Sequence, residues 1–175
     1  MPFSSFTLNA NLLKAIHTMG FEKPTPIQSL AVPPLMEGRD VMATAVTGSG
    51  KTAAFLLPIL HRLMEKPRGT TRALILAPTR ELAAQIAEHF HALAVHTSLK
   101  GAAVYGGVSM GPQEGAFRRG VDVLVATPGR LLDHCQYPYA RLTGIEYLVL
   151  DEADRMLDMG FLPDIRRILA HVPKK

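Results

Sequence analysis

A short glycine-rich segment, residues 47–52, has the composition of a phosphate-binding loop. Two glycines precede a lysine and a threonine, and an apolar stretch suited to a helix follows. Glycines let the backbone wrap around an anion, so that its N–H groups and the next helix N-terminus face the charge. The lysine can reach the β- and γ-phosphates of a nucleotide, and the threonine hydroxyl can bind Mg²⁺. The candidate nucleotide-binding residues of this segment are Thr47, Gly48, Ser49, Gly50, Lys51 and Thr52.

A group of acidic residues follows the apolar run from Tyr147 to Leu150. Asp151 can hold the metal ion that bridges the phosphates, and Glu152 can orient and deprotonate an attacking water. Alone, the pattern is also explained by the preference of acidic residues for a helix N-terminus. Together with the phosphate loop it predicts a nucleotide-hydrolysis site, with Lys51, Asp151 and Glu152 catalytic and with Thr52 and Asp151 as ligands of Mg²⁺.

An aromatic residue and a glutamine flank a proline-rich turn near the N-terminus, where Phe21 precedes Pro24-Thr25-Pro26-Ile27-Gln28. The Gln28 amide can pair with N6 and N7 of adenine, and an aromatic ring can stack on the base. A proline-rich turn before a helix is common, however, and explains the same residues without a ligand.

Three further clusters combine glycine, threonine and arginine in positions suited to a sugar-phosphate backbone. Helix N-termini, closely approaching backbone and guanidinium groups hold phosphates without reading bases. Ordinary turn chemistry explains each cluster better when the cluster is taken singly. The clusters contain Thr79 and Arg80, then Gly106 and Gly107, then Thr127, Gly129 and Arg130.

Five apolar runs are predicted to be strands, and each ends just before one of these polar clusters or loops. They are Val41–Ala45, Ala73–Ala77, Ala102–Tyr105, Val121–Ala126 and Tyr147–Leu150. The runs are continuous rather than alternating, which is typical of strands covered on both faces. The gaps between them can hold crossover helices, so a parallel sheet is expected, with the clusters gathered at its carboxyl edge.

Periodic apolar residues predict several helices. The strongest prediction runs from Arg80 to about Leu93, and others cover residues 11–19, with Gly20 as the C-terminal cap, and 162–172. A helix over 51–64 contains Pro58, which deletes a backbone hydrogen bond and is expected to kink the axis.

Composition indicates one globular domain in a reducing compartment. The chain has 175 residues, a net charge of +4, and Cys135 as its only cysteine, so no intrachain disulfide can form. It has no apolar stretch of membrane-spanning length and no signal-peptide pattern, so a cytoplasmic location and no membrane partner are expected. The positive charge permits a polyanionic partner. His89, His91 and His96 do not share the four-residue spacing of two ligands on one helix face and are interpreted as solvated surface.

The motifs AVTGSGKT, PTREL, GG, TPGR and DEAD, in this order and preceded by GFEKPTPIQ, resemble the first RecA-like domain of DEAD-box RNA helicases of the bacterial type. Ala45 replaces the first glycine of the generic phosphate-loop pattern and is usual in this family. The resemblance implies an α/β fold, namely a RecA-like P-loop domain with a parallel sheet and helices on both faces. It also implies a Q-motif segment over residues 1–30 and an ATP-binding helicase domain over residues 31–175.

The resemblance further implies an ATP-dependent RNA helicase that uses ATP and Mg²⁺ and acts on single-stranded or locally duplexed RNA. Gln28 would bind adenine, Phe21 would stack on it with Phe3 in support, and Asp154 would couple the ATP site to moving elements. The residues that would contact RNA are Thr79, Arg80, Gly106, Gly107, Thr127, Gly129 and Arg130.

Similar proteins continue with a Ser-Ala-Thr strand and a second RecA-like domain that supplies arginine fingers. The chain is therefore interpreted as truncated before that strand, and alone it is expected to be marginally stable and to hydrolyse ATP very slowly. A nucleotide-gated RNA clamp or assembly factor remains an alternative to a helicase. A small-molecule kinase does not account for PTREL, TPGR and DEAD together.

Overall fold

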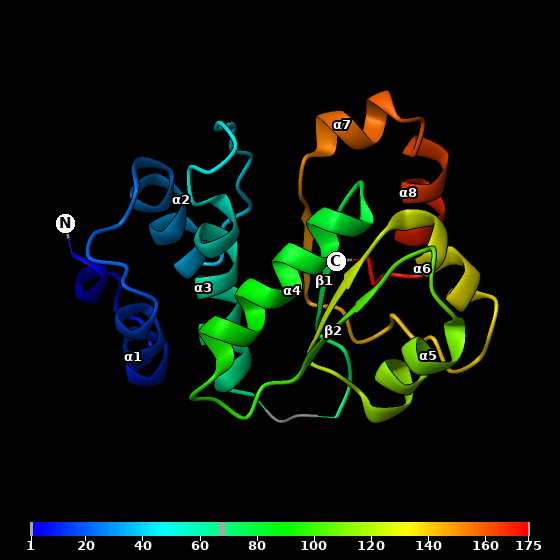
Figure 1. The fold of residues 1–175 in the computed structure, drawn as a ribbon, viewed down its shortest axis with the longest axis horizontal. Coiled ribbons are helices and arrows are strands. Elements are labelled where there is room, and N and C mark those ends of the chain that lie inside the picture. The colour runs from blue at the N-terminus through cyan, green and yellow to red at the C-terminus, as the bar shows by residue number, and fades with distance from the viewer. Residues whose placement is uncertain (1, 67–68, 175) are drawn as a thin grey trace. The chain divides into compact units, whose positions relative to one another are not determined.

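The computed structural model describes residues 2–66 and 69–174, which form two compact units. One unit comprises Met1–Pro67 and His89–Ser98, and the other comprises Arg68–Glu88 and Leu99–Lys175. The long helix α4 (Arg80–Ala94) contributes residues to both (Figure 1). No helix among the described residues has the length and apolar character needed to cross a bilayer.

The first unit is built from helices around an aliphatic core. It contains a 3-10 turn η1 (Phe3–Phe6), α1 (Ala10–Thr18), α2 (Pro26–Met36) and α3 (Lys51–Met64). Leu12, Val32, Leu56 and Leu60 are fully buried within it. As predicted, α1 ends at a left-handed glycine: Gly20 has φ +74°, which a residue with a Cβ adopts only at a cost.

Proline shapes the helices of this unit without breaking them. The predicted helix over 51–64 is confirmed as one continuous helix through Pro58. Helix α2 begins with Pro26 in its first turn, where the missing N–H costs nothing, and it contains Pro33 and Pro34 close to its end. Burial of both helices against each other offsets the backbone bonds lost at these prolines.

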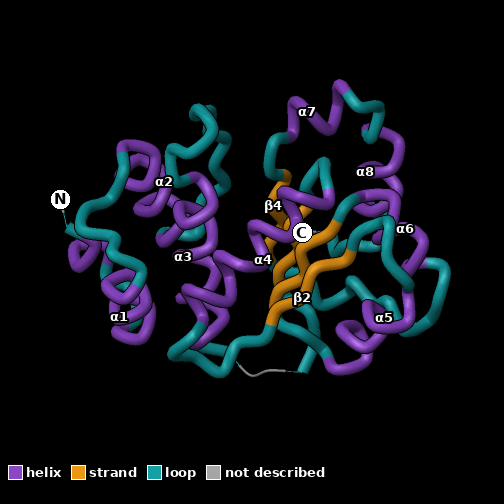
Figure 2. The backbone as a smooth tube through the Cα atoms, viewed as in Figure 1, coloured by secondary structure: helices purple, strands orange, loops and turns teal. Residues whose placement is uncertain are grey.

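The second unit contains a four-stranded parallel sheet in the order β2-β3-β1-β4 (Figure 2). The strands are β1 (Ala73–Leu76), β2 (Gly101–Val104), β3 (Val123–Ala126) and β4 (Tyr147–Leu150). The helices are α5 (Met110–Arg119), α6 (Pro128–Cys135), α7 (Ala153–Asp158) and α8 (Leu162–Leu169), together with the first half of α4. These elements confirm the predicted α/β class and parallel sheet.

Both faces of the central strands are buried, as their continuous apolar sequences predicted. Leu74, Leu124 and Val104 belong to one core cluster with residues of α5, α6, α7 and α8. On the opposite face, Ile75 and Val125 are also buried. The edge strand β4 differs, because Leu148 and Leu150 are each 37% exposed and no strand of the described residues pairs with its outer edge.

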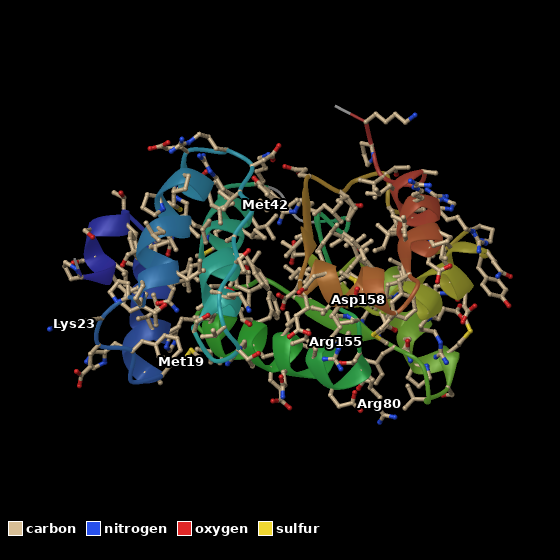
Figure 3. All side chains as sticks on the ribbon, turned by 90° about the horizontal axis from the view of Figure 1, so that it is seen from above. Met19, Lys23, Met42, Arg80, Arg155 and Asp158 are labelled. Atoms are coloured by element: carbon tan, nitrogen blue, oxygen red, sulfur yellow. The ribbon has the colours of Figure 1, made fainter. Side chains whose placement is uncertain are left out.

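The predicted strand over Val41–Ala45 is wrong. Residues 41–46 form no regular structure, and Met42 is fully exposed (Figure 3). A strand is stable only when its N–H and C=O groups pair with a neighbour, and none of the described strands pairs with this segment. The apolar composition of the run predicted a strand, but it did not encode the partner on which a strand depends.

A buried ion pair joins the amino ends of the strands. Arg72 and Asp122, just before β1 and β3, lie 2.7 Å apart with side chains 3% and 0% exposed. The second carboxylate oxygen of Asp122 accepts a hydrogen bond from the backbone N–H of Lys100, just before β2, at 2.9 Å. The carbonyl oxygen of Arg72 accepts the N–H groups of Glu146 and Tyr147 at the start of β4. One charged pair therefore sits where all four strands begin.

Candidate nucleotide site and nucleic-acid interface

The predicted phosphate loop leads directly into α3. Gly48 and Gly50 have φ of +79° and +91°, and Gly50 is the N-cap residue without a side-chain cap. Lys51 Nζ donates a hydrogen bond to the carbonyl oxygen of Ala45, at the start of the loop. The Ser49 hydroxyl is buried and has no hydrogen-bond partner among the described residues. A glycine-rich turn, an uncapped helix N-terminus and an unsatisfied buried hydroxyl fit a bound phosphate group.

Gln28 links the start of α2 to this loop. Thr25 and Gln28 form a capping box, in which the Gln28 Oε1 accepts the Thr25 N–H at 3.0 Å. The Gln28 Nε2 also donates to the carbonyl oxygen of Gly50 at 3.1 Å. A Cβ on Gly50 would lie 2.5 Å from that nitrogen, so only glycine allows this approach. The sequence did not predict this contact, because the two residues are 22 positions apart.

The aromatic residues predicted for the same site do come together. Phe3 and Phe21 stack with ring centroids 6.4 Å apart and an interplanar angle of 22°. Gln28 uses one lone pair and one N–H in the bonds above, which leaves one acceptor and one donor for a base edge. The residue is nevertheless only 3% exposed, so this edge does not face solvent.

The acidic motif lies at the carboxyl end of β4. Asp151 is buried, and its Oδ1 accepts the N–H of Glu152 at 3.1 Å. Glu152 has φ +50° and ψ +50°, a left-handed conformation that costs about 1–2 kcal/mol for a residue with a side chain. Its Oε2 lies 3.3 Å from Arg155 NH1 in α7, while Asp154 is exposed. Strain at a predicted catalytic residue is consistent with a site held in a specific geometry.

The predicted backbone-binding clusters follow β1 and β2 as expected. Thr79 caps α4, its hydroxyl accepting the Leu82 N–H at 3.2 Å, and Arg80 lies over the ring of Tyr105 with its Cζ 5.2 Å from the centroid. Gly107 has φ +82°, and a Cβ there would lie 3.0 Å from Arg80 NH1. The Arg80 side chain extends from the beginning of α4 (Figure 3). The PTREL and GG segments therefore meet.

The third cluster follows β3 and joins the second. Thr127 is the N-cap residue of α6, and its N–H donates to the carbonyl oxygen of Val104 at the end of β2. Arg130 NH1 donates to the carbonyl oxygen of Val108 at 2.8 Å. Gly106 and Gly129 are exposed and have open space where a Cβ would stand. The seven predicted residues thus lie at the carboxyl ends of β1, β2 and β3, where α4 and α6 also begin.

A buried polar network behind this edge was not predicted. Gln113 of α5 accepts the Tyr105 N–H and donates to the Tyr105 carbonyl oxygen, at 3.1 and 3.0 Å. His134 of α6 lies 3.4 Å from Gln113 Oε1 and 2.9 Å from the Tyr139 hydroxyl. Burial, with a smaller effect from Arg130, lowers the pKa of His134 and so favours the neutral imidazole. The sequence signal for this network was a single glutamine, Gln113, on a largely polar helix. One polar residue forms no periodic pattern, so the sequence did not mark it as buried.

The predicted site residues fall into two sets. Gln28 and residues 47–52 belong to the first unit, whereas Asp151, Glu152 and the seven backbone-binding residues belong to the second.

The described residues contain no group of three or more His, Cys, Asp or Glu side chains suited to a metal. His89 and His91 are exposed as interpreted, but the interpretation as solvated surface is wrong for His96, whose Nε2 is buried without a hydrogen-bond partner among the described residues.

The sequence of this chain is similar to those of known proteins along nearly its whole length. The family model described as "DEAD/DEAH box helicase" matches residues 25–175. The ATP-dependent RNA helicase SrmB of Escherichia coli is 48% identical over 95% of this chain and 38% of its own length. DEAD-box ATP-dependent RNA helicase 30 of Arabidopsis thaliana is 48% identical over 93% of this chain and 28% of its own length.

The ATP-dependent RNA helicase vasa of Drosophila melanogaster is 47% identical over 97% of this chain and 26% of its own length. The chain therefore spans between about a quarter and two fifths of the length of these relatives. The family match covers most of the sequence and includes the phosphate loop, the DEAD motif and the edge formed by β1, β2 and β3. This chain belongs to the DEAD/DEAH box helicase family.

Proposed function

We propose that this chain is the ATP-binding part of an ATP-dependent RNA helicase. The observation that carries the proposal is the phosphate loop. Its uncapped helix N-terminus and the Ser49 hydroxyl, which has no hydrogen-bond partner among the described residues, can both bind an anion. The relatives named above are ATP-dependent RNA helicases, which supports the same nucleotide and the same class of substrate for this chain.

The nucleotide would be held by the loop and by the first helices of the same unit. Residues 47–50 would wrap the phosphates, and Lys51 would exchange its bond to the Ala45 carbonyl oxygen for one to a phosphate. Gln28 and Phe21 would select adenine. Because Gln28 is buried, we expect the binding of adenine to require a conformational change that exposes its amide.

Hydrolysis would rest on the DEAD motif. Thr52 and Asp151 would hold Mg²⁺, which when bound neutralises charge on the phosphates. Glu152 would take the proton of the attacking water, and its left-handed backbone would fix where its carboxylate points. Asp154, exposed in the first turn of α7, would pass changes at this site to neighbouring elements.

RNA would bind along the edge formed by β1, β2 and β3. Arg80 and Arg130 brace the 105–108 loop, which places exposed backbone at Gly106 and Gly107 where phosphates and sugars can approach. The motif residues read no base edges, so binding there would be independent of sequence. Contacts to 2′-hydroxyls would favour RNA over DNA.

Three features of the whole protein belong to the same proposal. We expect a Q-motif segment over residues 1–30, an ATP-binding domain over residues 31–175, and a second RecA-like domain that completes both sites in the cytoplasm. Without that second domain, turnover would be slow, because an arginine finger contributes about 10³ to 10⁵ in rate.

Two substitutions separate binding from chemistry. Lys51→Ala removes a charge-assisted contact to phosphate and should weaken ATP binding about 10- to 100-fold. Glu152→Gln keeps the shape of the side chain but removes the base, so binding should remain while hydrolysis falls by about 10² to 10⁴. Binding is measured with a fluorescent ATP analogue on this chain, and RNA-stimulated phosphate release is measured on the full-length protein.

Lys100→Ala, an exposed lysine outside the loop, is the matched control and should leave both measurements unchanged. Equal loss of nucleotide affinity in the Lys51 and Glu152 variants would contradict the separate roles assigned to them. Unwinding and RNA retention measured side by side would distinguish a helicase from a nucleotide-gated clamp.

A further inference from the structure

A groove of about 760 Å³ is lined by residues of α5 and of the segment that follows α6. Its volume lies within the range of about 300–1,000 Å³ found for sites that hold one small ligand. The walls are Met110, Glu114, Phe117, Arg118, Tyr137, Pro138, Tyr139 and Arg141. All of them belong to the second unit, and none is among the predicted site residues.

Stacked aromatic rings form one wall of the groove. Tyr137 and Tyr139 have ring centroids 5.5 Å apart and an interplanar angle of only 4°. Two contacts hold Tyr139 in place. Its hydroxyl lies 2.9 Å from a ring nitrogen of the buried His134, and its ring centroid lies 5.8 Å from that of Phe117. Tyr137 is 50% exposed, so it extends a rigid stack into solvent. An exposed ring held parallel to an anchored one is prepared to accept another planar group.

The charge of the groove is positive. Arg118 lies over the Tyr139 ring at 5.3 Å and is neutralised by Glu114 at 2.6 Å. Arg141 also lines the groove; it is exposed and has no carboxylate within ion-pair distance among the described residues. The net charge of the lining residues is therefore +1, from two arginines and one glutamate. Such a surface attracts an anion that also carries a planar ring.

The groove and the edge proposed to bind RNA are close along the chain. Met110 lines the groove and lies two residues beyond Val108, whose carbonyl oxygen accepts the hydrogen bond from Arg130. From Met110 to Arg118, α5 rises about 12 Å, which suffices for a short extension of a bound strand. Apolar anchors suited to a protein partner are few, because Phe117 is itself buried. Stacking rings beside an unpaired arginine match single-stranded nucleic acid better.

We propose that this groove is an accessory site for single-stranded RNA, in which a base stacks on Tyr137 and the adjoining phosphate pairs with Arg141. The inference rests on the proposed function, because the strand would arrive from the Gly106–Gly107 edge. The site adds length and affinity but no sequence preference, since every base has a face that can stack.

The chain contains no tryptophan, which allows a direct test. The Tyr137→Trp variant carries a single indole in the groove, and its fluorescence should be quenched by an oligouridylate of about 16 nucleotides but not by one of about 6 nucleotides. Tyr137→Ala should weaken binding of the longer RNA about 5-fold or more, while Tyr137→Phe, which keeps the ring, should bind normally. Arg141→Ala should reduce the slope of log affinity against log salt by about 0.7.

Two controls separate the groove from the edge. Arg166→Ala removes an arginine of α8 that is also exposed and lies outside the groove, and it should not change the length dependence. Arg80→Ala should weaken RNA of both lengths. RNA binding that responds to Arg80→Ala but not to Tyr137→Ala, with unchanged indole fluorescence, would overturn the groove and leave the proposed function intact. Absence of RNA binding in every variant would overturn both, and quenching by a proline-rich peptide but not by RNA would reassign the groove to a protein partner.

Discussion

Removing the Asp122 carboxylate should destabilise the second unit more than any surface substitution. Asp122→Ala would leave the Arg72 guanidinium buried, with its ion-pair partner at 2.7 Å lost, and would free the Lys100 N–H that the carboxylate accepts. Breaking a buried pair by deleting one member costs about 3–5 kcal/mol. Against a total stability of about 5–15 kcal/mol, that loss is a large fraction.

A second ion pair in the same unit provides the matched control. Glu114 and Arg118 lie 2.6 Å apart, but their side chains are 34% and 64% exposed. Exposed pairs contribute about 0.2–1 kcal/mol, so Glu114→Ala should cost no more than that. The two pairs have almost the same length, and burial alone predicts the difference between them.

The assay is urea unfolding followed by circular dichroism. With a slope of about 2 kcal/mol per molar urea, Asp122→Ala should lower the midpoint by about 1.5–2.5 M, whereas Glu114→Ala should lower it by less than about 0.5 M. The double replacement Arg72→Met with Asp122→Leu should recover most of the loss, because no charge is then left buried. Equal costs for Asp122→Ala and Glu114→Ala, or no recovery in the double variant, would refute this account.

Three further predictions concern single residues. Glu152→Gly should make the chain about 1 kcal/mol more stable than Glu152→Ala in the same urea assay, because glycine adopts the left-handed backbone without strain; equal stability would show that the strain is not real. Because the pKa of His134 is lowered on folding, the unfolded chain binds the proton more readily, so stability should be complete above about pH 6.5 and fall below it; His134→Gln should flatten this dependence, while the exposed-site control His89→Gln should retain it. Burial raises the pKa of Cys135 from 9.0 to about 11, so alkylation at pH 8 should be about 100-fold slower than in urea-unfolded chain, and equal rates would contradict the burial of the thiol.

Local sequence predicted most of the second unit because its strands are short, apolar and bounded by polar turns. The bounds of β4 match the apolar run Tyr147–Leu150, and those of β1 and β3 differ from the predictions by one or two residues. The failure at residues 41–45 has a physical cause: strand formation depends on a neighbour that the run itself does not encode. Composition indicates which segments favour extension, but pairing is decided elsewhere.

Residue types in the sequence predicted which segments contain the candidate site residues, but not the contacts that these residues make with one another. Motif chemistry correctly placed the DEAD group and the GG, PTREL and TPGR segments at strand ends. It could not predict that Gln28 would bind the Gly50 carbonyl oxygen, or that Gln113 would hold both backbone groups of Tyr105. Such contacts join residues brought close only by the tertiary fold, and a buried glutamine is indistinguishable in sequence from an exposed one.

The outer edge of β4 has a consequence for work with this chain in solution. Among the described residues no strand pairs with this edge, and β4 itself, with the exposed Leu148 and Leu150, contains no lysine or proline of the kind that protects such edges. Two copies that meet through this edge would extend one sheet into another. We therefore expect the amount of soluble monomer to decrease with protein concentration more than with temperature. The monomer should be lost to oligomers and precipitate rather than to the unfolded state.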